Sequence, residues 1–280
     1  MSVYVVTDST SDIPREIAEA HGITVVPLGV TFGAESFRDG VDLHPDDFFA
    51  RLQEAKALPT TSQPPPALFE HAYEHLATRG EVVSVHLSHK FSGTVESARS
   101  AAAKVAADRI SVVDSGSVSM GLGLCVIAAG ARAQAGGTRG EVVAAAESVA
   151  SRLHVAVAFE TLEYLRRGGR IGRAQAFVGG LLRVKPILTV RDGEAFPLSR
   201  ARSRRKAIDE LAALAEKFER VDDIVVCYTT TRDDAEELAA RVRSRHGGAA
   251  VAVGQFGSVL GVYGGPGMLG IAVVESAGEG

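Results

Sequence analysis

The sequence predicts an α/β protein whose first half forms a parallel sheet and whose second half is an α+β arrangement. Three observations lead to this prediction. The chain has 280 residues, which exceeds the usual size of one domain. Strand and helix signals alternate through the first half, as they do in βαβ units. After about residue 154 the pattern includes a hairpin signal, so the chain is expected to divide near that point.

The first half opens with a β-branched strand at 3–7, and a helix then begins at Ser11 to Pro14 and ends at Gly22. A polar cap and a proline in the first turn are typical of a helix start, and glycine is typical of its end. Prolines predict a loop at 57–66. Apolar runs and helical spacing predict the other elements. The strands are 23–30, 81–87 and 110–113, and the helices are 46–53, 68–77, 93–107, 121–135 and 138–153.

In the second half, the tetrapeptide Arg191-Asp192-Gly193-Glu194 lies between two apolar runs and predicts a hairpin of strands 186–190 and 195–198. Helical segments at 161–167 and 174–182 flank a glycine-rich break. Further strands are predicted at 155–159, 224–228, 249–255 and 269–274, and helices at 204–219 and 233–245. Hairpins mixed with helices indicate an α+β domain.

The composition excludes several classes of protein. Hydrophobic residues are 46% and charged residues 23% of the chain, which excludes wholesale disorder. A net charge of −4 and a pI near 6.1 argue against nucleic-acid binding. Cys125 and Cys227 follow apolar neighbours, so we expect core positions and neither a disulfide framework nor a cysteine zinc site. No signal-like start and no run of roughly 18 apolar residues is present, which predicts a soluble, cytoplasmic protein without stable membrane insertion.

Hydroxyl-rich loops follow three predicted strands. They begin at Thr7-Asp8-Ser9-Thr10, at Ser88 before Ser92-Gly93-Thr94, and at Asp114-Ser115. The carboxyl ends of parallel strands lie at one edge of a sheet, where ligands bind, and helix N-termini there favour an anion. The alternative is that these side chains only cap helices. Ser92-Gly93-Thr94 is the strongest candidate, because its glycine lets a ligand approach the backbone.

Three further segments are candidate ligand contacts. In Thr60-Thr61-Ser62-Gln63, hydroxyls beside prolines form a stiff loop, or a plain structural turn. The arginines and glycines of 166–172 suit an oxyanion, or a helix C-cap with exposed arginines. Tyr263 is expected on a tight loop before the last strand, either donating to a ligand or packing in the core.

Sharper catalytic motifs are not present. His71, Glu74 and His75 spell an inverted zinc-protease pattern, but they lie off the apolar stripe of their helix and no third ligand is visible, so we expect a solvated face and no metal. Neither a Walker loop nor Gly-x-Ser-x-Gly occurs. The basic run from Arg200 to Lys206 is typical of a solvated helix start or of a surface that docks an acidic partner. Hydroxyls, glycines and arginines without a catalytic pair favour binding of an anionic headgroup over catalysis, with no cofactor.

Seven motifs in order resemble the DegV family over about residues 1–275. They are Thr7-Asp8-Ser9-Thr10-Ser11-Asp12, Pro59-Thr60-Thr61-Ser62-Gln63-Pro64, Leu87-Ser88 with Ser92-Gly93-Thr94, Val113-Asp114-Ser115 with Gly121-Leu122-Gly123, Gly168-Gly169-Arg170-Ile171, Lys185-Pro186-Ile187 and Gly265-Pro266-Gly267. The resemblance implies a Rossmann-like α/β domain at 1–153 and an α+β domain at 154–280, with a lipid tunnel between or within them.

The resemblance also implies a function. Family members hold a long-chain fatty acid and present its carboxylate to a separate ATP-dependent kinase, which forms an acyl phosphate for phospholipid synthesis. Matched to the family motifs, Thr61 and Ser92 bind the carboxylate, Gly93 adds a backbone contact, and Arg170 shapes or neutralises the site. Arg202 is implied in kinase docking.

Two departures from the family pattern concern the ligand. Tyr263 stands where the family usually has a histidine; a tyrosine hydroxyl donates a hydrogen bond but does not become a cation near neutral pH. Lys90 and Phe91 lie in the loop before Ser92 and are expected to affect ligand choice. The alternative functions are a phosphotransferase acting on a small hydroxylated substrate, and a nucleic-acid or regulatory protein that uses residues 200–206.

Overall fold

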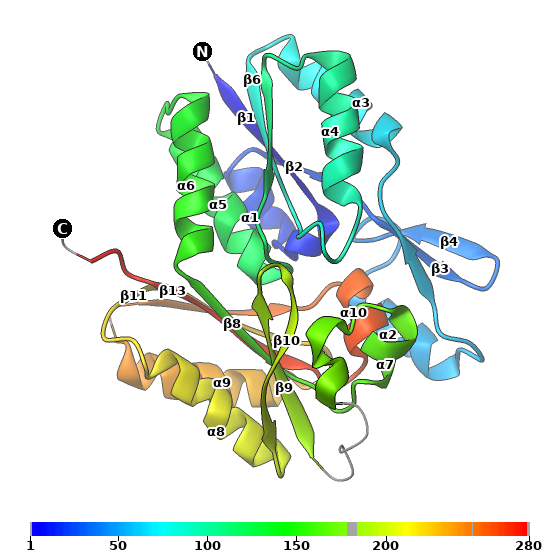
Figure 1. Cartoon of the computed structure of the whole chain (residues 1–280), viewed down its shortest axis with the longest axis vertical. Coiled ribbons are helices and arrows are strands. Elements are labelled where there is room, and N and C mark those ends of the chain that lie inside the picture. Colours follow the sequence, from blue (N-terminus) through cyan, green and yellow to red (C-terminus); the bar gives the residue numbers. More distant parts are fainter. Residues whose placement is uncertain (1, 178–183, 248, 279–280) are drawn as a thin grey trace. The chain divides into compact units, whose positions relative to one another are not determined.

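The computed structural model describes residues 2–177, 184–247 and 249–278, and it confirms the α/β class (Figure 1). Contacts divide the chain into two units. Unit 1 consists of Met1–Leu43 and Thr60–Ser151, and unit 2 of His44–Pro59 and Arg152–Gly280. The segment His44–Pro59 therefore belongs with the second half of the chain, across the linear division drawn from the sequence.

Unit 1 is built on a parallel sheet with strand order β2-β1-β6-β7. Figure 1 shows α3 and α4 on one face of this sheet and α5 and α6 on the other. The strands are β1 (Val3–Asp8), β2 (Ile23–Val26), β6 (Glu81–His86) and β7 (Ile110–Asp114), and the helices are α1 (Arg15–Ala20), α3 (Pro66–Ala77), α4 (Thr94–Val105), α5 (Met120–Gln134) and α6 (Arg139–Ser151). The predicted alternation of strands and helices is confirmed.

One core of unit 1 lies between the sheet and helices α3 and α4. It joins Val6 and Val82 of the strands to Phe69, Tyr73 and the alanines of α4, all buried. Side chains alternate across a strand, so Val82, Ser84 and His86 of β6 share the face toward α3. This face therefore contains two polar side chains that are fully buried.

A small antiparallel sheet of order β4-β3-β5 completes unit 1. Its strands are β3 (Gly29–Phe32), β4 (Glu35–Arg38) and β5 (Thr60–Ser62). The single strand predicted at 23–30 is wrong: Pro27 cannot donate a ladder hydrogen bond, and the chain enters a second sheet after Leu28. The loop predicted at 57–66 is wrong over residues 60–62, which pair with β3.

Unit 2 is built on a mixed sheet of order β10-β9-β8-β13-β11-β12. Its strands are β8 (Leu153–Ala158), β9 (Lys185–Arg191), β10 (Glu194–Ala201), β11 (Val221–Tyr228), β12 (Ala250–Gln255) and β13 (Leu269–Glu275). Helices α8 (Arg204–Ala215) and α9 (Arg232–Arg245) bury their apolar faces against it. The predicted hairpin of β9 and β10 is confirmed, with positive φ at Asp192 and Gly193 in its turn.

Three short helical elements of unit 2 lie near its glycine-rich segments. They are α7 (Glu163–Gly168), the 3₁₀ helix η2 (Gly172–Phe177) and α10 (Ser258–Gly264). The helix predicted at 174–182 is a 3₁₀ turn up to Phe177, and residues 178–182 lie outside the described residues. The loop predicted around Tyr263 is wrong, because α10 forms despite its glycines. Across the described residues, no helix is both long and apolar enough to cross a membrane.

Close packing explains why His44–Pro59 belongs to unit 2. Helix α2 (Pro45–Glu54) contributes Phe48 and Phe49, which are buried and meet edge to face with 5.0 Å between ring centroids. A Cβ atom added to Gly261 of α10 would lie 2.5 Å from Cε1 of Phe48. The glycine thus allows α10 to approach the two rings.

We expect Gly261→Ala to lower the free energy of unfolding by about 1–3 kcal/mol, because the new methyl group overpacks the contact with Phe48. Urea denaturation measures the change. Gly140→Ala is the matched control: Gly140 lies in α6 with no atom within 4 Å of an added Cβ, so alanine stabilises by up to about 1 kcal/mol. Equal stability changes in the two variants would contradict the packing argument.

Candidate functional site

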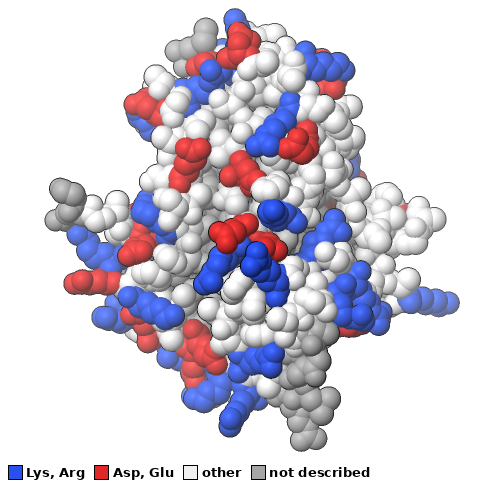
Figure 2. Space-filling model, viewed as in Figure 1, with Lys and Arg blue, Asp and Glu red and all other residues white. Residues whose placement is uncertain are grey.

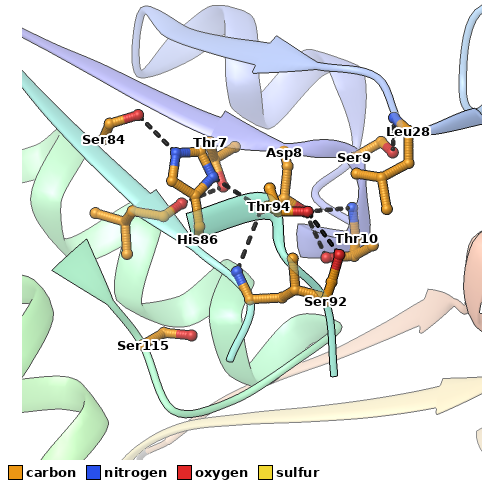
Figure 3. Close-up of polar contacts among 12 residues, drawn as sticks. Thr7, Asp8, Ser9, Thr10, Leu28, Ser84, His86, Ser92, Thr94 and Ser115 are labelled. Carbon is orange, nitrogen blue, oxygen red and sulfur yellow. Dashed lines mark hydrogen bonds and ion pairs between the residues drawn. The ribbon is translucent and has the colours of Figure 1, made fainter. Parts of the chain in front are cut away.

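The carboxyl-terminal edge of the parallel sheet is organised around Asp8, the last residue of β1 (Figure 3). Its Oδ1 accepts from the Thr10 backbone N–H (3.1 Å) and the Thr10 hydroxyl (2.5 Å). Its Oδ2 accepts from Nδ1 of His86 (2.9 Å) and the Leu87 N–H (3.2 Å). Asp8, Thr10 and His86 are fully buried. Four donors thus compensate one buried carboxylate. Asp8 also caps the following 3₁₀ turn, as the alternative interpretation of this loop expects. The polar cap predicted for the next helix is wrong, because the N-cap of α1 is Pro14.

A line of hydrogen bonds continues from His86 into the core. Nε2 of His86 lies 2.7 Å from Oγ of Ser84, which accepts from the Tyr73 hydroxyl at 2.8 Å. Because the Asp8 carboxylate only accepts, Nδ1 of His86 donates to it, and the line is satisfied when the Ser84 hydroxyl donates to Nε2 and accepts from Tyr73. Burial raises the pKa of Tyr73 above its ordinary value, against the opposing hydrogen bond to Ser84. Each polar side chain in the line has its partners.

Ser92, Gly93 and Thr94 form the start of α4, as predicted. Oγ of Ser92 lies 2.9 Å from Oγ1 of Thr94, and Thr94 is fully buried while Ser92 is partly exposed. The Ser92 N–H donates to the carbonyl of Ser88 at 3.3 Å, which closes a turn between β6 and α4. Ser92 therefore presents a hydroxyl beside the N-terminus of a helix.

The Thr61 segment lies against this helix start. Thr61 is opposite Val30 in the ladder of β5 and β3. Two residues on, the Gln63 amide donates to Oγ of Ser97 on α4 at 2.9 Å. A Cβ atom on Gly93 would lie 2.3 Å from Oε1 of Gln63. The structure thus brings together the segment 60–63 and the start of α4, which the sequence analysis identified separately. The hydrogen bond from Gln63 to Ser97 connects them.

The loop after β7 is joined to the other two strand-end loops. The Ser119 hydroxyl donates to Oδ2 of Asp12 at 2.5 Å, which connects this loop to that after β1. The Ser88 N–H donates to the carbonyl of Ser117 at 2.9 Å, which connects the loops after β6 and β7. The Ser117 side chain is buried, and its Oγ has no partner among the described residues. The expected convergence of the three loops is confirmed.

The loop before Ser92 carries two basic side chains, His89 and Lys90. Nδ1 of His89 lies 2.5 Å from Oδ2 of Asp114, and the His89 N–H donates to the same oxygen at 3.2 Å. Lys90 is exposed, and its N–H donates to Oγ of Ser88. The imidazole and the ammonium therefore lie on the loop that leads from β6 to α4.

In unit 2, Arg170 lies with Tyr263. The guanidinium carbon of Arg170 is 5.1 Å from the centroid of the Tyr263 ring, and Nη1 donates to the carbonyl of Gly168 at 2.9 Å. A Cβ atom on Gly168 would lie 2.5 Å from that ring. Gly169, with φ of +70°, ends α7 as a left-handed C-cap, so the capping interpretation of this segment is confirmed.

The other two arginines of this segment share one carboxylate, which leaves a net charge of +1 on the three side chains. Arg166 and Arg167 both bind Glu163, and their hydrogen bonds lower the pKa of Glu163 to about 2.

The basic run 200–206 divides into structural and exposed members. Arg204 binds Asp234 at 2.8 Å and the carbonyl of Gly267 at 2.6 Å, so it connects α8 to α9 and to the segment before β13. Arg200 stacks on Phe177 at 4.2 Å. Arg202 follows β10, is exposed, and has no hydrogen bond or ion pair within residues 2–177, 184–247 and 249–278. Arg202 therefore keeps its guanidinium in water.

The inverted zinc-protease pattern and the two cysteines occupy different environments in the structure. His71, Glu74 and His75 are exposed on α3, the solvated face that the sequence predicts. Within the described part of the chain, no group of three His, Cys, Asp or Glu side chains is placed to hold a metal ion. On the face drawn in Figure 2, Lys and Arg lie among Asp and Glu. Cys125 and Cys227 are buried, and burial raises the pKa of Cys125 to about 12.

Sequence reasoning missed Tyr73, Ser84 and His86 as members of the polar network. A signal for two of them was present: Ser84 and His86 are two residues apart in a strand whose other residues are mainly valine, so both lie on one face of a covered sheet. Buried polar side chains need partners. That these partners are Asp8 and Tyr73 requires the tertiary structure.

Comparisons with known proteins give one consistent family. The model described as "Uncharacterised protein, DegV family" matches residues 2–276. A DegV domain-containing protein of Streptomyces coelicolor is 41% identical over 278 residues, 97% of this chain and 98% of that protein. The structure of a DegV family protein from Thermus thermophilus that binds fatty acid superposes with a TM-score of 0.91 at 35% identity, covering 99% of this chain and 100% of that one. A stearic acid-binding protein from Eubacterium ventriosum has a TM-score of 0.89 at 26% identity, covering 98% of each chain.

Proposed function

Since the chain belongs to the DegV family, we propose that it is a cytoplasmic carrier that binds a long-chain fatty acid and presents the carboxylate to a separate ATP-dependent kinase. The observation that carries this proposal is the match, over nearly the whole chain, to solved family members that bind fatty acids. The chain itself acts as the lipid-binding partner, and acyl-phosphate formation belongs to the kinase.

In unit 1, we assign the carboxylate contacts to Thr61, Ser92 and Gly93. Two hydroxyl donors and a backbone position at a helix N-terminus suit a carboxylate, because hydrogen bonds to a charged group are stronger than neutral ones. The hydrogen bond from the Gln63 amide to Ser97 holds the two segments together.

Affinity comes mainly from the acyl chain. About 14 methylenes at about 0.8 kcal/mol each give roughly 11 kcal/mol of apolar transfer before the costs of binding. An apolar tunnel supplies this energy without a catalytic group, and the hydroxyls orient the headgroup. Excluding water also protects an acyl phosphate from hydrolysis.

In unit 2, we assign Arg170 and Tyr263 to fatty-acid binding. The Arg170 guanidinium supplies a permanent positive charge for a carboxylate, and the Tyr263 ring beneath it fixes its orientation. Tyr263 takes the place of the usual family histidine with a hydroxyl donor. Its contribution is therefore a hydrogen bond and a stacking surface rather than a second cation.

The proposal is tested by native mass spectrometry of the purified chain, followed by denaturing extraction of any bound molecule. We expect a stoichiometric mass increment equal to a long-chain fatty acid, and uptake of added palmitic or stearic acid by delipidated protein. A chain that is empty and takes up neither acid contradicts the carrier function. If the chain alone also transfers phosphate from ATP to a small hydroxylated substrate, the phosphotransferase alternative holds instead.

We expect Arg202→Ala to slow acyl-phosphate formation by the partner kinase at least about tenfold, because charged contacts at an interface control association, while fatty-acid affinity stays unchanged. The measurement is the kinase rate as a function of carrier concentration, with the carrier fully loaded. Arg245→Ala, at the exposed end of α9, is the matched control. Equal rates for the two variants would remove Arg202 from the docking surface.

A further inference from the structure

We infer that His86 is a positioning residue for the headgroup site: it fixes the carboxylate of Asp8, and Asp8 holds the two segments that carry Thr61 and Ser92. This inference rests on the proposed function and extends it to a residue that makes no contact with ligand. It concerns unit 1 alone.

His86 is itself held from three sides. Nδ1 donates to Oδ2 of Asp8 and Nε2 accepts from Ser84. The ring also meets Phe69 edge to face, with 5.0 Å between centroids and 78° between planes. A fully buried ring with both nitrogens bonded is held in one orientation, and the Asp8 carboxylate favours the proton on Nδ1. Asp8 is therefore bonded to a donor that cannot move away from it.

One oxygen of Asp8 acts on the Ser92 segment. Oδ2, which His86 holds, also accepts from the Leu87 N–H, the first residue beyond β6. The next residue, Ser88, uses its carbonyl to accept from Phe91 and Ser92. Two short steps thus connect the His86–Asp8 bond to the backbone of Ser92.

The other oxygen of Asp8 acts on the Thr61 segment. Oδ1 accepts twice from Thr10 and fixes the 3₁₀ turn Ser9–Ser11. Oγ of Ser9 accepts from the Leu28 N–H at 3.1 Å. Leu28 leads directly into β3, whose Val30 is opposite Thr61. The same carboxylate thus holds the start of β3, the strand that pairs with Thr61 of β5.

Two hydroxyls that bind one carboxylate must keep a fixed separation. Displacement of a positioned group by about 1 Å is enough to lose most of its effect. The acyl chain is insensitive to such a displacement, because apolar burial has no direction. Loss of the His86–Asp8 bond should therefore weaken recognition of the headgroup and leave chain burial intact.

The readout is the preference for acid over alcohol: the ratio of the Kd of a fatty alcohol to the Kd of the fatty acid of equal chain length. His86→Asn places an amide where Nδ1 was and keeps a donor to Asp8. His86→Gln places its amide where Nε2 was and leaves Asp8 without that donor. We expect the ratio to fall about tenfold in His86→Gln, as when outer hydrogen-bond partners of other sites are lost. It should stay within about threefold of wild type in His86→Asn.

His246→Asn is the matched control, since His246 is a buried histidine of unit 2 whose Nε2 is bonded to the Ala215 carbonyl, and asparagine has no amide at the Nε2 position. This variant should lose stability and keep the wild-type ratio. A wild-type ratio in His86→Gln, equal losses in both His86 variants, or the same fall in His246→Asn would each overturn the inference alone. A wild-type protein that binds acid no better than alcohol would overturn the proposed function together with it.

Discussion

Asp8→Ala is expected to lower the free energy of unfolding by about 4 kcal/mol. Four donors lose their acceptor in a fully buried position. They are the N–H and hydroxyl of Thr10, Nδ1 of His86 and the N–H of Leu87. Each buried donor left without a partner costs about 1–3 kcal/mol, and some of them find water or neighbouring acceptors after relaxation. Urea denaturation followed by circular dichroism measures the loss.

Two further variants separate this effect from loss of charge. Asp8→Asn keeps one acceptor oxygen, so a smaller loss is expected. Glu19→Ala removes a carboxylate whose ion pair with Arg15 is exposed, and its denaturation midpoint should stay close to that of the wild type. Asp8→Ala within about 1 kcal/mol of wild type would show that the buried network is not important for stability.

Ser92→Ala is expected to raise the Kd for a long-chain fatty acid about 10- to 100-fold. This range corresponds to loss of one hydrogen bond to a charged group, about 1.5–3 kcal/mol. Isothermal titration of delipidated protein measures it. Ser151→Ala, at the exposed end of α6, is the matched control and should bind as the wild type does.

A double-mutant cycle tests whether Ser92 and Thr61 share the ligand. Thr61→Val removes the hydroxyl and keeps the β-branched shape that suits β5. If both hydroxyls bind one carboxylate, the double variant should lose less affinity than the two single losses combined. Wild-type affinity in Ser92→Ala would exclude this hydroxyl from the headgroup site.

The parallel sheet of unit 1 could be predicted because its strands and helices are long enough to show their own periodicity. Valine-rich runs became β1, β6 and β7, and the long helices follow their apolar spacing. The short elements could not be predicted in the same way. β5 has three residues between prolines, and its strand conformation comes from pairing with β3, which is far away in the sequence.

In the glycine-rich segment before the last strand, the sequence predicted a loop where the structure has the helix α10. Its glycines favour a loop on propensity alone, yet α10 forms because Gly261 lets the helix pack against Phe48. Tertiary contact outweighs local preference there. The same limit applies to the site: the hydroxyl-rich loops were visible in the sequence, whereas His86 and Tyr73 are identified only by their partners.

The membership of α2 in unit 2 has a consequence for synthesis of the chain. Helix α2 ends at Glu54 and its partner α10 begins at Ser258, so roughly two hundred residues separate them. At about 5–20 residues per second, a ribosome needs about 10–40 s to make that interval. During this time Phe48 and Phe49 have no packing surface from α10. Unit 2 therefore completes the contact between α2 and α10 only near the end of translation.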